Sequence, residues 1–464
     1  MSFASYWAVL VLGCCVACGS SGSSSSTPRD WLAEAHDEDP RDDVVRVSLR
    51  STPKDLEIVP GSSTRMLTYS GRVPGPLIRA KRGDLLRVHF ENGLDTPATV
   101  HWHGVRVPNA MDGVPDVTQP PVQPGAVFDY EFELPDAGLF WYHPHTDSVA
   151  TLGSGQYGVL LVSDPSEPKE LGEEVVLVLS DIGLDDNGQV VPPDADPQKI
   201  LVGREGNRLL VNGRVYPTLL ARSGQRQRWR VLNAARSRYF KLGLSGHTFL
   251  RVGADGGLAE HGVEVAEPVI APGERLDLVV SPQGNSDSPL ELMALAHSRG
   301  RPLAESIPHA LMRIEFSGSA VNAGATPTWT TTLAPIDTSD ATEVPIALTV
   351  DGADGKVSMG INGVPFGAGE ELHAHIDSRQ VLAIENKSVY SHPFHLHGYF
   401  FQELDDAGQP LRPLLLKDTI DIPPLARRKL AVSYDSRPGM WMFHCHILDH
   451  AEAGMMGMVD VMAH

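Results

Sequence analysis

Residues 444–450, close to the C-terminus, read HCHILDH, with a single cysteine between two histidines. In a β-strand, side chains two positions apart share a face, and direct neighbours point to opposite faces. We therefore expect His444 and His446 to present two imidazoles side by side, while the thiol of Cys445 points the other way. A strand of this kind offers metal ligands to two places at once.

Three further histidine clusters lie closer to the N-terminus. They read HWHG at residues 101–104, WYHPH at 141–145 and HPFHLHG at 392–398. A single His-x-His pair is a common coincidence on a protein surface. Four pairs, two in the first third of the chain and two in the last third, are hard to produce by chance. The pattern therefore predicts metal binding rather than histidines that only pack in a core.

The lone cysteine indicates which metal these clusters hold. One thiolate with two imidazoles and a weak axial thioether is the ligand set of a blue-copper electron-transfer site. His392 and His450 offer the imidazoles, and Met455 follows Cys445 by ten positions. Zinc prefers a compact tetrahedral set of cysteines and histidines, which one cysteine beside many histidines does not supply. The composition favours copper.

The rest of the chain is typical of a β-protein. Its 44 Gly and 36 Pro, with few long stretches of helix formers, predict many short strands and turns. Residues 44–49, 85–90 and 175–179 have the pattern of strands. The 58 acidic residues outnumber the 38 basic ones, giving a net charge of -20. Such a surface repels phosphate backbones, so nucleic-acid binding is excluded.

An internal repeat predicts how the strands are organised. A turn containing Gly and Pro, then an apolar strand that ends in Asn, occurs at residues 71–92, 212–233 and 362–386. The closing segments read LLRVHFEN, QRWRVLN and QVLAIEN. A period of about one domain predicts three copies of one β-domain, because solenoid repeats are far shorter. We expect domains at 44–166, 167–317 and 344–464, with a linker at 318–343.

The N-terminal segment has the features of an export signal. Residues 6–17 are apolar but too few to span a bilayer as a helix. Small residues precede Cys14 and Cys18, and a Ser-rich tether follows at 19–43. We expect a signal at 1–18, export to the periplasm or cell surface, and a lipid anchor at Cys14 or Cys18; an ordinary cleaved signal peptide is the alternative. Cys445 is then the last remaining cysteine, so no disulfide framework is expected.

Taken together, the four histidine clusters resemble the signature of the multicopper oxidases, and the resemblance covers the chain from about Val44 to its end. It implies an all-β fold of three cupredoxin-like Greek-key β-sandwich domains with four copper ions. It also implies a laccase-like, monomeric enzyme that reduces O2 to water. Its donors would be aromatic or phenolic compounds or low-valent metal ions (Cu(I), Fe(II), Mn(II)), each giving one electron at a time.

The resemblance also assigns the copper ligands residue by residue. It gives the type 2 copper His101 and His395. It gives the type 1 copper His392, Cys445, His450 and, axially, Met455. It gives the type 3 pair His103, His143, His145, His397, His444 and His446. Electrons would pass from the type 1 copper through Cys445, whose backbone continues directly into His444 and His446.

Reduction of O2 also consumes four protons, so buried carboxylates that relay protons are expected near the copper cluster. Asp112 matches the acidic residue that the family places near the type 2 copper. Asp449 stands where bacterial relatives usually have Glu, one methylene longer. We expect both carboxylates to act as relays.

Two other functions and one further metal site remain to be weighed. A non-enzymatic copper-binding envelope protein on the same fold is the main alternative. A copper nitrite reductase is disfavoured, since it needs only two domains and lacks the full set of eight cluster histidines. Near the C-terminus, four methionines suggest either a Cu(I) docking site or core packing: Met440, Met442, Met456 and Met458. Their alternation along apolar strand ends favours packing.

Overall fold

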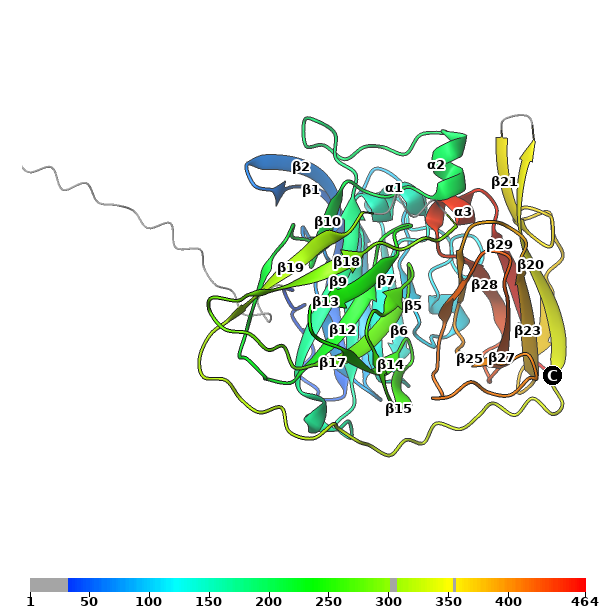
Figure 1. Ribbon diagram of the computed structural model, residues 1–464. Helices are drawn as coiled ribbons and strands as arrows, with labels where there is room; N and C mark the ends of the chain where they lie inside the picture. Colours follow the sequence, from blue (N-terminus) through cyan, green and yellow to red (C-terminus); the bar gives the residue numbers. More distant parts are fainter. Residues whose placement is uncertain (1–31, 301–306, 354–355) are drawn as a thin grey trace, which may run out of the picture.

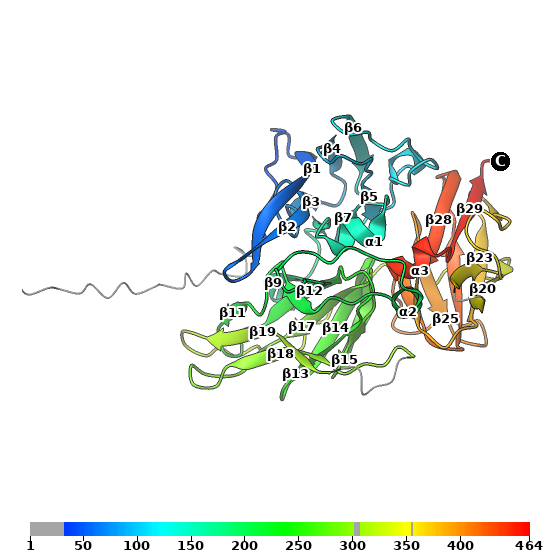
Figure 2. The same cartoon turned by 90° about the horizontal axis from the view of Figure 1, so that it is seen from above.

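The computed structural model describes residues 32–300, 307–353 and 356–464. The predicted signal and most of the predicted tether lie outside these residues. Within them, the chain forms six β-sheets that pair into three sandwiches. Seen from above, the sandwiches occupy the corners of a triangle, with the first and second on one side and the third opposite (Figure 2).

The first sandwich packs two four-stranded sheets. In one sheet the strand order is β2 (Ser62–Tyr69), β1 (Val44–Val59), β4 (Leu85–Asn92) and β6 (Val127–Glu133). In the other it is β3 (Ile78–Lys81), β8 (Gly158–Ser163), β7 (Gly138–His143) and β5 (His101–His103). The predicted strands at 44–49 and 85–90 are confirmed as β1 and β4, which run parallel.

The second sandwich contains no histidine cluster. Its larger sheet has the order β10 (Arg208–Val211), β9 (Glu173–Ile182), β12 (Gln227–Asn233), β17 (Arg275–Val280), β14 (Phe249–Ala254) and β15 (Gly257–Val265). Its smaller sheet has the order β11 (Thr218–Ala221), β19 (His309–Phe316), β18 (Leu290–Leu295), β13 (Phe240–Leu244) and β16 (Val269–Ile270). A long, mostly exposed segment then leads from β19 to the third sandwich along the outside of the molecule (Figure 1).

The third sandwich packs two five-stranded sheets. One has the order β21 (Lys356–Ile361), β20 (Thr342–Ala353), β23 (Arg379–Asn386), β27 (Arg427–Ser433) and β25 (Phe401–Leu404). The other has the order β22 (Leu372–His375), β29 (Met456–Met462), β28 (Gly439–Cys445), β24 (His392–Leu396) and β26 (Thr419–Ile422). Buried apolar residues of the first and third sandwiches form one continuous cluster, whereas the second sandwich has a core of its own. The first and third sandwiches are therefore held together by a shared core.

The predicted repeat is confirmed by three buried asparagines in equivalent places. Asn92, Asn233 and Asn386 each end the central strand of a sheet, and each is almost inaccessible to solvent. Each side-chain amide donates to two or more backbone carbonyls and accepts the backbone N–H two residues further on. A buried amide without partners costs several kcal/mol, so these hydrogen bonds must be kept in the folded state. Each asparagine therefore holds the loop that follows it against the sheet, in the same way in all three sandwiches.

Helices are few and short in the part of the chain that the structure describes. They are α1 (Ser148–Gly153), α2 (Pro197–Val202) and α3 (Leu448–Glu452), with 3-10 turns at Asn109–Met111 and Lys169–Leu171. The all-β prediction is thus confirmed. None of the helices within the described ranges is long and apolar enough to cross a membrane. All three α-helices lie on one side of the molecule (Figure 1), and α3 contacts both α1 and α2.

Candidate metal centres

The histidine clusters come together where the first and third sandwiches meet. In the first sandwich, β5 pairs with β7 so that His101 lies opposite His143. In the third, β24 pairs with β28 so that His395 lies opposite His444. Rings from the two sandwiches then stack: the centroids of His103 and His395 are 3.7 Å apart, with an angle of 7° between the rings. Residues about 300 positions apart therefore share one site.

Three of the predicted ligands form a separate group, which we call the cysteine site: His392, Cys445 and His450. The Sγ atom of Cys445 lies 3.5 Å from Nδ1 of His392 and 3.6 Å from Nδ1 of His450. The two Nδ1 atoms are 3.0 Å apart. All three side chains are fully buried. Their donor atoms thus converge on a single point, as the ligands of one ion do.

The outer nitrogens of the two imidazoles in the cysteine site are each held by a neighbour. Nε2 of His392 lies 2.7 Å from the hydroxyl of Ser388. Nε2 of His450 lies 3.1 Å from the backbone carbonyl of Leu201, in α2. Met455 is fully buried in the same apolar cluster as Cys445, and its carbonyl accepts the backbone N–H of Cys445. These contacts fix both rings with Nδ1 directed at the thiol.

The eight histidines predicted for the type 2 and type 3 coppers form the second group, which we call the histidine cluster. Within it, three triplets each have donor atoms within 4.8 Å of one another. The triplets are His101, His103 and His395; His103, His143 and His446; and His145, His397 and His444. Every histidine that the sequence assigned to the type 2 and type 3 coppers is brought into this cluster.

Unpartnered nitrogens show that the histidine cluster suits metal ions. Five of its buried histidines have a ring nitrogen without any hydrogen-bond partner among the described residues: His101, His103, His143, His395 and His446. In four of the five, the other ring nitrogen is held by a backbone carbonyl or a side chain. A buried polar atom without a partner is costly, and a metal ion would satisfy it. The donor set therefore fits the copper ions that the resemblance implies.

Burial also sets the protonation of these groups in the metal-free protein. It lowers the pKa of His392 and of His145 to about 3, so both imidazoles are neutral near pH 7 and keep a lone pair for a metal. It raises the pKa of the Cys445 thiol well above its usual value. A metal ion that binds the thiolate of Cys445 must therefore displace the proton of the thiol.

Asp112 links the two sandwiches inside the histidine cluster. Its Oδ2 accepts from Nδ1 of His397 at 2.8 Å, and its backbone carbonyl lies 2.7 Å from Nδ1 of His101. Burial alone would raise the pKa of this carboxyl, but the interactions with His397 and His101 outweigh it and hold the pKa well below its usual range. In the metal-free protein Asp112 is therefore an ionised carboxylate that orients one imidazole from each of the first and third sandwiches.

A second buried carboxylate, Asp418, was missed by the sequence analysis. Its Oδ1 lies 3.0 Å from Nε2 of His103, and its backbone carbonyl lies 2.9 Å from Nδ1 of His395. Arg275, on β17 of the second sandwich, donates to both carboxylate oxygens. Sandwich two thus supplies no histidine but holds the carboxylate that orients two of them. No local signal in the sequence connects Arg275 with Asp418.

Asp449, the second predicted proton relay, is engaged by Arg204. Its carboxylate accepts from the guanidinium and, at 2.8 Å, from the backbone N–H of Arg204. Glu452, further along α3, lines a cavity of about 230 Å³ together with His143, His145 and His444. The position of Asp449 in the family's motif does not specify its contact with Arg204, which lies 245 positions away in the chain.

Comparisons with known proteins agree with this geometry. Sequence profiles described as multicopper oxidase match residues 51–167, 173–298 and 339–464. The multicopper oxidase MmcO of Mycobacterium tuberculosis is 30% identical over 452 residues, covering 90% of this chain and 87% of that protein.

Two solved structures extend the likeness to the fold. A multicopper oxidase from Pseudomonas thermotolerans is 32% identical with a TM-score of 0.78, covering 90% of this chain and 99% of that one. A multicopper oxidase from Campylobacter jejuni, described as a metallo-oxidase, is 28% identical with a TM-score of 0.83, covering 93% and 94%.

Proposed function

Because the chain belongs to the multicopper oxidase family and is an oxygen-reducing copper oxidoreductase, we propose that it oxidises small one-electron donors, with low-valent metal ions ahead of bulky phenols. The carrying observation is the covered edge of His450 in the cysteine site. His450 and His392 are both fully buried, and the carbonyl of Leu201 occupies the outer nitrogen of His450. A flat aromatic donor therefore has no exposed imidazole edge to contact.

The family's four copper ions supply, when bound, one-electron redox chemistry and the capacity to bind O2. We propose that the cysteine site with Met455 holds the type 1 copper. We propose His101 and His395 for the type 2 copper and the remaining six histidines of the cluster for the type 3 pair. The unpartnered buried nitrogens and the converging donor atoms support this assignment. The predicted domain limits at 44–166, 167–317 and 344–464 are proposed likewise, since the strands of the first two sandwiches fall within them and β20 of the third begins only two residues before its limit, at Thr342.

The protein's own groups perform three tasks in this proposal. Ser388 and Leu201 hold the imidazoles of the cysteine site. Asp112 and Asp418 orient those of the histidine cluster. Cys445 and His444 are consecutive on β28, so a short covalent path joins the two sites. Because the two side chains point to opposite faces of the strand, each serves its own site.

The net charge of the protein, -20, supports cationic donors. At α2 itself, Asp194 is paired with Lys199 and Arg204, so the attraction comes from the charge of the whole protein. An excess of negative charge raises the concentration of cations near the surface and repels anions. Figure 2 shows α2 beside α3, which carries His450. A metal ion at this surface would lie close to the cysteine site without contacting its imidazoles.

We expect replacement of residues 195–202, which include α2, by a Gly-Ser-Gly linker to uncover His450. The ratio of phenol turnover to Fe(II) turnover should rise by at least about tenfold, equivalent to roughly 1.4 kcal/mol of barrier. Steady-state rates with one bulky phenol, Fe(II), Cu(I) and Mn(II) on a single preparation measure it. The matched control places the same linker in the turn at 285–288 of the second sandwich, far from α3. An unchanged ratio would contradict the role of α2.

We also expect the purified protein to be blue and to bind about four copper ions per chain. The colour comes from charge transfer between the Cys445 thiolate and Cu(II), and the number follows from the family's ligand set. Metal analysis and the visible spectrum measure both. One zinc per chain without copper would overturn the proposal, and full copper content without O2 uptake would favour the non-enzymatic alternative.

The proposed location is outside the cytoplasm. Its support is the apolar N-terminal stretch and the small residues before Cys14 and Cys18. We propose export with a lipid anchor at one of these cysteines, and a monomeric enzyme. Radiolabelled palmitate incorporation that is lost in Cys14→Ser or Cys18→Ser would identify the anchored residue, whereas no incorporation in the wild-type protein would favour an ordinary cleaved signal.

A further inference from the structure

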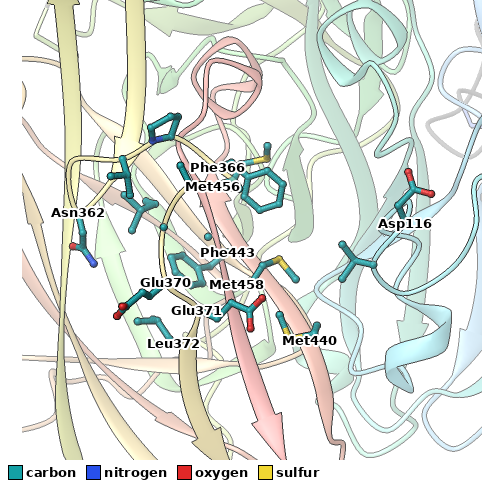
Figure 3. A pocket seen from close by; sticks show the side chains of 18 residues that line it. Asp116, Asn362, Phe366, Glu370, Glu371, Leu372, Met440, Phe443, Met456 and Met458 are labelled. Carbon is teal, nitrogen blue, oxygen red and sulfur yellow. The ribbon is translucent and has the colours of Figure 1, made fainter.

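A cavity of about 780 Å³ lies against β28, β29 and the segment before β22, and none of the predicted copper ligands lines it. Met440, Met456 and Met458 line it from β28 and β29, and Asp116 lies across from them on the first sandwich (Figure 3). We call it the methionine cavity. Met442, fully buried, packs against Met458 beside it.

Its lining has the chemistry of a site for a soft cation. Three carboxylates line it: Asp116, Glu370 and Glu371. Among the described residues that line the cavity, none is Lys, Arg or His. The carboxylates therefore attract a cation, and the thioethers select a soft one, because methionine sulfur prefers Cu(I) over hard ions.

Core packing, the interpretation favoured by the sequence, is supported for all four methionines, but three of them also line the cavity. Met442 and Met458 pack against Val114 and are 3% and 8% exposed. Met440 and Met456 pack against the same group but are only partly buried, and both line the cavity. Their thioethers are therefore accessible to an ion in the cavity.

The pairing of β28 with β29 places the methionines in a row that ends at His444 of the histidine cluster. Met442 lies opposite Met458, and His444 lies opposite Met456. Side chains directly opposite on one face of an antiparallel pair have Cβ atoms about 4.5–5.5 Å apart. Because Met440, Met442 and His444 alternate along β28, they share one face, the one opposite Cys445. The sulfurs therefore lead from the cavity to a histidine of the cluster.

The methionine cavity also adjoins the smaller cavity described above. Both are lined by Val117, Phe366 and Met456, and the smaller one is lined by His143, His145 and His444. An ion that leaves the thioethers thus meets imidazole nitrogens next.

We propose that the methionine cavity binds Cu(I) and delivers it to the histidine cluster when the enzyme acquires its copper. The transfer is an exchange of thioether for imidazole ligands, so it needs no electron and no proton donor. The methionine cavity lies on the face of β28 opposite Cys445, and its proposed role does not depend on which electron donor the oxidase uses. The site is thus a loading site, distinct from the one that accepts electrons.

Binding is tested with Ag(I), a soft monovalent ion that does not change oxidation state under these conditions, titrated into the copper-loaded enzyme. We expect one Ag(I) per chain and shifts in the Cε-methyl NMR signals of Met440, Met456 and Met458. Met440→Leu and Met456→Leu should each weaken binding by at least about tenfold; a similar volume preserves packing. Met312→Leu, buried in the second sandwich, is the matched control. Equal Ag(I) affinity in all variants, or no bound Ag(I), would overturn the site.

Delivery is tested by adding limiting Cu(I) without oxygen to the copper-free protein. The double variant Met440→Leu/Met456→Leu should load at least about tenfold more slowly than Met312→Leu, as followed by copper content after rapid desalting. Given excess copper and time, it should reach the same blue absorbance, which shows that the copper ligands are intact. Equal loading rates would overturn delivery. An unloadable or colourless wild-type protein would instead contradict the oxidase proposal.

Discussion

Replacing Cys445 by serine should abolish both the blue colour and the oxidase activity. A hydroxyl does not supply the thiolate that gives the charge-transfer band, and the covalent path along β28 loses its sulfur. Turnover should fall to that of the copper-free protein. Visible absorbance, copper content and O2 uptake on one sample measure the result.

The copper content provides the internal control for Cys445→Ser. The histidine cluster lies on the opposite face of β28, with its own ligands from β5 and β7, so the variant should keep about three of four coppers. Loss of all copper would mean that the substitution unfolds the site. An active, colourless protein would contradict the proposed path through Cys445.

Replacing Asp112 by asparagine should slow the reaction of the reduced enzyme with O2 by about 10²–10⁴-fold, the typical contribution of a general acid-base group. The amide keeps the shape and can still accept one hydrogen bond, but it cannot take up and release a proton near neutral pH. Stopped-flow mixing of donor-reduced enzyme with O2 isolates this step. Reduction by the donor should be unchanged, because the cysteine site is not altered.

The comparison variants separate proton transfer from orientation of the imidazoles. Asp112→Glu keeps an ionisable carboxylate, so it should react with O2 faster than Asp112→Asn. The copper content of both variants shows whether the histidines still bind their ions. Asp449→Asn should have the smaller effect, since its carboxylate is engaged by Arg204 rather than by a histidine. Unchanged O2 reaction in both asparagine variants would leave Asp112 and Asp449 with structural roles only.

Local periodicity explains which features could be predicted from the sequence. The His-x-His spacing and the Asn92, Asn233 and Asn386 repeat depend on residues close together in the chain, and strand alternation determines their directions. The pairing of Arg275 with Asp418 spans 143 positions and two sandwiches, so no window of sequence contains it. The contact between Leu201 and His450 involves a backbone carbonyl, which any residue type supplies. The contact of Asp449 with Arg204 spans 245 positions, so the local motif does not reveal it either.

The ion pair between Arg275 and Asp418 has a consequence for how such a chain can change in length. A shortened protein that joined its outer two sandwiches directly would retain every copper-binding side chain, yet Asp418 would remain buried without its cation. Removing one partner of a buried pair typically costs about 3–5 kcal/mol, a large part of the stability of a typical domain. The carboxylate would then become protonated or turn toward water, releasing His103 and His395. Deletion of the second sandwich is therefore tolerated only if another cation takes the place of Arg275 at the same time. The second sandwich, which supplies no copper ligand, is thus as difficult to lose as the first and third, which do.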